Sequence, residues 1–119
     1  MHYAVLGPRD FREVEYDNYP YVKSILESFP DATALISGGA RGVESLVHTF
    51  ALETDIEFIK IAPIFKGRGP DAAFNIRNVE IMERGDELVV FWDGEAPRIR
   101  DFIIQSMKRG KEVTVIPMK

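Results

Sequence analysis

Residues 33–51 read TALISGGARGVESLVHTFA and contain the pattern that decides the fold. The stretch begins with a short apolar run at 33–36, which is typical of a buried strand. It ends with apolar residues from Val43 to Ala51 spaced by three and four positions, which form one face of a helix. A glycine-rich turn separates the two. A strand, a tight turn and a helix in this order predict one βα unit of a parallel sheet.

The same alternation of apolar runs and helical periodicities continues along the whole chain. We expect further strands at 3–6, 57–62, 87–92 and 112–116, and further helices at about 17–29, 71–84 and 97–109. This βαβαβαβαβ order predicts an α/β fold, namely a Rossmann-like doubly wound three-layer sandwich with a mostly parallel five-stranded sheet in a single domain spanning 1–119. The first and fourth strands should be neighbours where the strand order reverses.

Composition excludes several classes of protein. The chain has 119 residues, a net charge of −4, two histidines and no cysteine, which argues against disulfides, metal sites and thiol nucleophiles. The longest apolar run, 88–92, is far shorter than the ~20 residues of a membrane helix, and the N-terminal apolar run is unlike a signal peptide. We therefore expect a cytoplasmic protein with no membrane partner. The mild acidity argues against capture of bulk nucleic acid.

The glycine-rich turn is the clearest candidate binding site. Ser37, Gly38, Gly39, Arg41 and Gly42 lie directly before the second helix. Glycine lets the backbone approach a ligand closely, the helix start offers unpaired N–H groups to an anion, and arginine suits phosphate or carboxylate. We expect an anion site here. The alternative is a tight strand-to-helix turn with a solvated arginine.

Two neighbouring positions extend this candidate site. Gly7 and Arg9 follow the first strand, and an arginine beside a glycine at the carboxyl end of a strand can face the same crevice. The alternative is an ordinary surface turn. Glu44 lies one helical turn after the glycines, which makes it a candidate for ligand binding and a weak candidate for catalysis. A glutamate there also favours the helix dipole without any further role. We expect His48, off the apolar stripe of the same helix, to be solvated or structural.

The third helix and the end of the fourth strand provide the other candidates. Arg77 and Asn78 share the apolar, sheet-facing side of the helix, where polar groups need a partner, either a ligand or the backbone. Trp92 could stack on a base, and Asp93 could accept from a ribose hydroxyl or act in catalysis. The alternative for this pair is a core aromatic followed by an Asp-Gly turn.

Four motifs occur together in this chain. They are Gly7-x-Arg9-x-Phe11, residues 36–44 (ISGGARGVE), Arg77-Asn78 with Met82 and Asp86, and residues 90–94 (VFWDG). In these motifs the chain resembles the SLOG superfamily, which relates DprA to the LOG nucleoside-monophosphate phosphoribohydrolases. It is most similar to the small single-domain YpsA- and YspA-like branch, which is common in bacteria and their phages, so the resemblance implies a cytoplasmic protein of a bacterial or phage-infected cell. The resemblance covers nearly the whole chain and implies a Rossmann-like fold that binds a nucleotide or an NAD derivative, with no firmly implied cofactor.

The chain departs from the family pattern after the fourth strand. Members usually have a loop ending in Gly-Thr there, whereas this chain has Glu95-Ala96-Pro97-Arg98. The resemblance therefore implies a weakened phosphate contact, which the charge of Arg98 could replace. The catalytic glutamate of the LOG enzymes has no match, and Asp101 corresponds to it only loosely.

Three functions follow as hypotheses. The leading one is a small sensor-like protein that binds a nucleotide-like molecule without turning it over. The second is an N-glycosidic hydrolase acting on nucleoside monophosphates or NAD-like molecules, with Asp10, Glu44 and Asp93 as the available carboxylates. The third is DprA-like binding of single-stranded nucleic acid through basic residues. A homodimer or higher homo-oligomer is a further expectation, because Ile76 and Val79 form an apolar pair on the outer side of the third helix.

Overall fold

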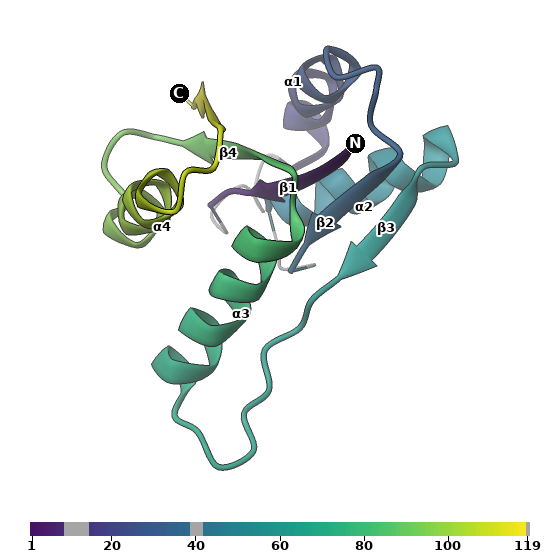
Figure 1. Ribbon diagram of the computed structural model, residues 1–119. Helices are drawn as coiled ribbons and strands as arrows, with labels where there is room; N and C mark the ends of the chain where they lie inside the picture. The colour runs from purple at the N-terminus through teal and green to yellow at the C-terminus, as the bar shows by residue number, and fades with distance from the viewer. Residues whose placement is uncertain (9–14, 39–41, 119) are drawn as a thin grey trace.

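The computed structural model describes residues 1–8, 15–38 and 42–118, in which strands and helices alternate (Figure 1). The elements are β1 (His2–Leu6), α1 (Glu15–Glu27), β2 (Ala34–Ser37), α2 (Val43–Thr54), β3 (Glu57–Lys60), α3 (Pro70–Arg84), β4 (Glu87–Trp92), α4 (Pro97–Lys108) and β5 (Val113–Pro117). The predicted order of elements is confirmed, with small shifts at the boundaries.

The five strands form one sheet with the order β3-β2-β1-β4-β5, and every pair is parallel. The predicted contact between the first and fourth strands is confirmed, with Leu6 of β1 opposite Val90 of β4. The connections that leave β1 and β4 run to opposite sides of this pair. Open sheets of this kind bind ligands beyond the carboxyl ends of the strands at such a switch point.

Helices cover both faces of the sheet, as a three-layer sandwich requires. Val22 of α1 and Phe50 of α2 belong to a core on one face. Ile81 of α3 and Phe102 of α4 belong to a second core on the other face. The strands supply both cores, which explains why their sequences are apolar without polar alternation.

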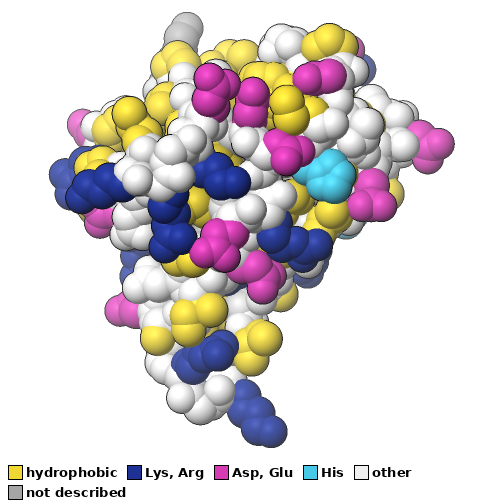
Figure 2. Space-filling model, in the orientation of Figure 1, with side chains coloured by type: hydrophobic (Ala, Val, Ile, Leu, Met, Phe, Trp, Pro, Cys, Tyr) yellow, Lys and Arg dark blue, Asp and Glu magenta, His cyan; other side chains and the backbone are white. Residues whose placement is uncertain are grey.

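Helix α3 and the segment before it extend past the carboxyl ends of β2 and β3 (Figure 1). Phe65 of this segment packs edge-on against Phe74 of α3, with ring centroids 5.6 Å apart. Figure 2 shows hydrophobic and basic side chains next to one another on this projection. The projection forms a wall beyond the sheet, and a cleft lies between this wall and α4.

Across the described residues, no helix combines the length and apolar character needed to cross a membrane.

Candidate functional site

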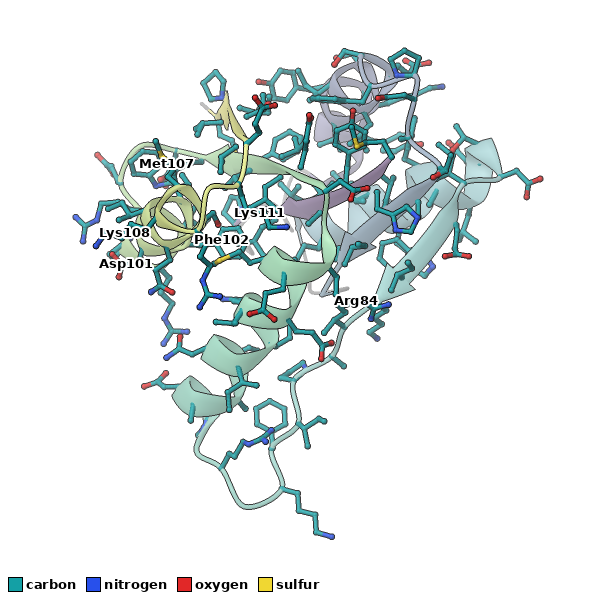
Figure 3. All side chains as sticks on the ribbon, viewed as in Figure 1. Arg84, Asp101, Phe102, Met107, Lys108 and Lys111 are labelled. Carbon is teal, nitrogen blue, oxygen red and sulfur yellow. The ribbon has the colours of Figure 1, made fainter. Side chains whose placement is uncertain are left out.

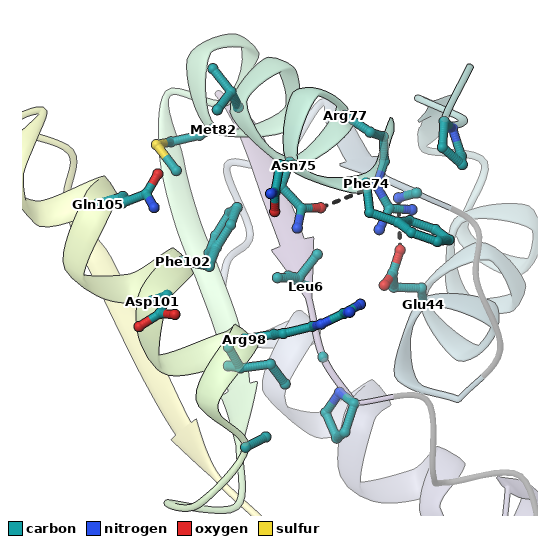
Figure 4. A pocket seen from close by; sticks show the side chains of 18 of the residues that line it. Leu6, Glu44, Phe74, Asn75, Arg77, Met82, Arg98, Asp101, Phe102 and Gln105 are labelled. Carbon is teal, nitrogen blue, oxygen red and sulfur yellow. Dashed lines mark hydrogen bonds between the residues drawn. The ribbon is translucent and has the colours of Figure 1, made fainter. Parts of the chain in front are cut away.

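A cleft of about 930 Å³ opens at the carboxyl end of the sheet, between α3 and α4 (Figure 4). Leu6 and Gly7 at the end of β1 and Gly38 after β2 form part of its lining. Its volume falls in the range of about 300–1,000 Å³ that is usual for small-molecule and cofactor sites. The location is the one that the strand order predicts for a ligand.

Glu44 of α2 is a buried carboxylate at one end of this cleft. Only 2% of the residue is exposed. Its Oε1 accepts hydrogen bonds from the Ser37 hydroxyl at 3.1 Å and from the Gly38 backbone N–H at 2.8 Å. A buried carboxylate is costly unless such donors satisfy it, and hydrogen bonds to a charged acceptor are strong. Glu44 therefore fixes the backbone where β2 ends.

Arg77 reaches the same point from α3. An ideal Cβ built on Gly38 would overlap the Arg77 guanidinium and lie 2.7 Å from Glu44 Oε1, so the ends of both side chains would have to move to admit a larger residue. Figure 4 shows Arg77 and Glu44 pointing toward one another from opposite walls. One end of the cleft thus places a guanidinium and a carboxylate against a glycine backbone.

Further contacts hold the Arg77 side chain in place. Its Nε donates to Asn78 Oδ1 at 3.1 Å, and its guanidinium carbon lies 5.2 Å from the centroid of the Phe74 ring. An arginine over an aromatic face gains a cation–π interaction. Only 9% of Arg77 is exposed, yet the residue lines the cleft. The arrangement presents a pre-positioned planar cation to any anion that enters.

The cleft brings together only part of the sequence-predicted set. Gly7, Gly38, Glu44, Arg77 and Asn78 all line it. Ser37 is fully buried behind Gly38 and bonds Glu44. Gly42 begins α2 with a φ of 78°, which favours glycine. The predicted residues Arg9, Gly39 and Arg41, and the possible carboxylate Asp10, lie outside the described residues.

Trp92 and Asp93 form the turn between β4 and α4. The Trp92 indole N–H donates to the Ala96 carbonyl at 3.1 Å. Asp93 Oδ1 accepts from the N–H groups of Ala96 and Glu95 at 2.9 and 2.8 Å, and these bonds lower the pKa of Asp93. Neither residue belongs to the described lining of the cleft. The geometry therefore supports the structural alternative for this pair, in which they form a turn.

Two expectations about the outer faces of helices have different outcomes. His48 is exposed and stacks on Phe58 with ring centroids 4.3 Å apart, which confirms a solvated, structural position. Ile76 is 49% exposed, but Val79 is half-buried and lines the cleft. The expected outward-facing apolar pair is therefore wrong, because α3 projects past the sheet and turns more of its surface toward the cleft.

Sequence reasoning missed the second half of the site. Met82 and Phe102 are buried apolar residues that line the cleft where α3 faces α4. Asn75, Asp101 and Gln105 provide polar groups there. A four-residue spacing on α4 puts Asp101 and Gln105 on one face, and this was the available signal.

The mouth of the cleft carries a surface ion pair. Arg98 in the first turn of α4 contacts Asp71 in the first turn of α3, with 2.7 Å between Nη2 and Oδ1. Both side chains are mostly exposed. Among the described residues, no group of three histidine or acidic side chains is arranged to hold a metal ion.

Comparison of the chain with protein-family models and with curated proteins finds no match to either. The fold and the cleft therefore define its class: a parallel α/β protein of Rossmann-like architecture with a small-molecule-sized cleft at the switch point of its sheet.

Proposed function

We propose that this protein binds a nucleoside phosphate or a similar nucleotide-like anion in the cleft between α3 and α4. The observation that carries the proposal is the position of Arg77, whose guanidinium lies against Gly38 at the carboxyl end of β2 and lines the cleft. A planar guanidinium forms bidentate, charge-assisted hydrogen bonds with phosphate. Gly38 belongs to the glycine-rich turn in which the sequence predicts an anion site.

The charges that line the cleft favour an anion despite the net charge of −4. Lys60, Arg77 and Arg98 are the cationic residues of the described lining, and Glu44 and Asp101 are the acidic ones. At the end of the cleft near β2 and β3, the cations Lys60 and Arg77 outnumber the one carboxylate, Glu44, so the described lining there has a local excess of positive charge.

We propose binding without turnover. Hydrolysis of an N-glycosidic bond needs a carboxylate that can act on the sugar or on water. Oε1 of Glu44 holds Ser37 and Gly38, and Asp93 holds the turn before α4. Both carboxylates thus have positioning contacts that suit a binding protein. The relationship to the SLOG superfamily is part of this proposal and is supported by the motifs and by the Rossmann-like sheet.

Titration calorimetry with GMP, AMP, ribose 5-phosphate and inorganic phosphate tests binding. Charge-assisted hydrogen bonds are worth roughly 1.5–3 kcal/mol each, so Arg77→Gln should weaken nucleotide binding by at least about tenfold. Arg84→Gln is the matched control, because Arg84 is exposed at the far end of the same helix (Figure 3). Circular dichroism shows whether each variant is folded. A folded Arg77→Gln protein with wild-type affinity would refute the proposal.

Chromatography of free base after incubation with nucleoside monophosphates and NAD tests turnover. We expect no release at rates typical of an enzyme. An ordinary enzyme would release base at about 1 s⁻¹ or faster. If the protein does so and Glu44→Gln abolishes the release, the proposal of a binding protein is refuted in favour of an N-glycosidic hydrolase.

A further inference from the structure

The cleft has two chemically different ends (Figure 4). The end at Gly38 has a net positive charge in its described lining, because Lys60 and Arg77 lie there with one carboxylate, Glu44. The other end lies between α3 and α4, where Met82 and Phe102 form a buried apolar floor, 1% and 4% exposed. An apolar floor suits the ring of a ligand, whereas the positively charged end suits its phosphate.

Two polar side chains border the apolar floor. Asp101 and Gln105 are four residues apart on α4, so they are neighbours on one helix face, and both line the cleft (Figure 4). The Asp101 side chain is 60% exposed, and its ion pair with Arg100 is long, with 3.7 Å between Oδ1 and Nε. Such a weak exposed pair leaves the carboxylate available to a ligand. Asn75 adds an amide from the opposite wall.

The Asp101 carboxylate favours a nucleobase ring with a particular hydrogen-bonding edge. A carboxylate has two acceptor oxygens and no donor, so its best partner presents two adjacent N–H groups. Among the common nucleobases, guanine presents such an edge, through its ring N1–H and its exocyclic amino group. Adenine presents an acceptor, N1, beside its amino group, which places a lone pair against the carboxylate.

We propose that the end of the cleft at Met82 and Phe102 is a guanine subsite, in which Asp101 accepts hydrogen bonds from N1–H and the exocyclic amine. Gln105 supplies an amide N–H to the neighbouring carbonyl oxygen of the base. Phe102 and Met82 pack against the ring. This inference rests on the proposed nucleotide binding and narrows its ligand to a guanine nucleotide.

A panel of nucleotides tests the base specificity by calorimetry. GMP should bind most tightly. IMP lacks the amino group and should bind about tenfold more weakly or worse, because one charge-assisted hydrogen bond is lost. AMP and ribose 5-phosphate should be weaker again. Equal affinities for GMP, IMP and AMP would overturn the guanine subsite.

Asp101→Asn changes the acceptor pair into one acceptor and one donor. That pair matches the edge of xanthine, which has N1–H beside a carbonyl oxygen. The variant should therefore lose affinity for GMP by about tenfold or more and prefer XMP. Asp55→Asn is the matched control, since Asp55 is an exposed residue after α2 outside the described cleft lining, and asparagine tolerates its φ of 60°. A reversed preference in the control, or none in Asp101→Asn, would overturn the inference.

The two proposals fail in different ways. If Arg77→Gln abolishes binding while the wild-type protein does not distinguish the bases, the anion site stands and the guanine subsite is overturned. If neither the nucleotides nor ribose 5-phosphate binds to the wild-type protein, both are overturned.

Discussion

The two ends of the sheet use polar residues in opposite ways. At the amino end, polar groups bond to one another across the strands. The His2 N–H donates to Asp86 Oδ2 at 2.8 Å, the Tyr3 hydroxyl donates to Asp31 Oδ1 at 2.7 Å, and the Lys111 ammonium donates to the Gly85 carbonyl at 2.8 Å. Figure 3 shows Lys111 near the junction of α3 and β4. These bonds tie the start of the fold together.

At the carboxyl end, polar groups surround a cleft. Arg77, Asn78, Asp101 and Gln105 all line it, and Glu44 fixes its glycine backbone. The two ends therefore differ in role under the proposed function: the bonds at the amino end contribute mainly to stability, and the carboxyl end holds the proposed ligand site. Substitutions at the two ends should therefore affect different measurements.

The largest effect is expected for Glu44→Ala. The change leaves the buried Ser37 hydroxyl and Gly38 N–H without their acceptor, and each unsatisfied group costs roughly 1–3 kcal/mol. We expect a loss of about 2–4 kcal/mol of unfolding free energy, measured by urea denaturation. Glu44→Gln retains an acceptor oxygen and should lose less. Glu44 is the exception to the division between the two ends, because it lies at the carboxyl end but is buried. Equal stability of wild type and Glu44→Ala would show that its buried hydrogen bonds do not stabilise the fold.

Gly85→Ala should lower stability without altering the cleft. The added Cβ would lie 2.6 Å from Ala4 Cβ and 3.1 Å from the Ala4 nitrogen, and this backbone belongs to β1. Overpacking of this kind costs roughly 1–3 kcal/mol. Gly69→Ala is the matched control, because nothing lies within 4 Å of its added Cβ and its φ is −72°. We expect a lower melting temperature for Gly85→Ala alone. A weakened GMP affinity in folded Gly85→Ala would contradict the separation of the two ends.

The sequence predicts the fold well because its signals are local. Apolar runs such as 87–92 and the helical stripe that contains Val47 and Phe50 each specify an element within a few residues. The contact between β1 and β4 follows from the general rules of doubly wound sheets. The same local reasoning placed Arg77 on the sheet-facing side of α3, and the residue is buried there.

Half of the site has no such local signal. The floor formed by Met82 and Phe102 depends on how far apart two helices lie on one sheet face. The contact of Arg77 with Gly38 joins residues distant in the chain. Trp92 carries a ring that could stack on a base, but its indole N–H bonds the Ala96 carbonyl in the folded chain. Such pairings depend on tertiary distances that periodicity and motif spacing do not contain.

A smaller, pH-dependent effect is expected at the amino end. Burial and a hydrogen bond with Glu112 raise the pKa of Glu87 above its ordinary value. Because its pKa is raised in the folded protein, the native state holds the Glu87 proton more tightly than the unfolded state does. Protonated Glu87 therefore stabilises the fold below the unfolded pKa, and this stabilisation is lost as pH rises through the folded pKa. Glu112→Gln removes one cause of the shift and should flatten this decline as pH rises above the ordinary glutamate pKa of about 4.3.

Melting temperature against pH measures the effect. Glu95→Gln is the control, because it removes a charge after β4 at the other end of the sheet. The pKa of Asp86 is shifted in the opposite direction, because the hydrogen bond from the His2 N–H lowers it. The stability that ionised Asp86 contributes is therefore lost as pH falls through its folded pKa. An unaltered pH slope in Glu112→Gln would show that the two glutamates do not interact in solution.

The smallest effect is expected for the ion pair at the mouth of the cleft. Arg98 and Asp71 join α4 to α3 at 2.7 Å, but their side chains are 73% and 83% exposed, and exposed pairs contribute about 0–1 kcal/mol. A double-mutant cycle with Arg98→Ala and Asp71→Ala should therefore give a coupling energy below about 1 kcal/mol in urea denaturation.

If the Arg98–Asp71 pair belongs to the proposed ligand site, its effect appears in the affinity for GMP instead. Asp71→Ala releases Arg98 toward the phosphate and should strengthen GMP binding by up to about fivefold, and Arg98→Ala should weaken it. A coupling of several kcal/mol, with GMP affinity unchanged in both variants, would assign the pair to stability and remove the contrast between the two ends of the sheet.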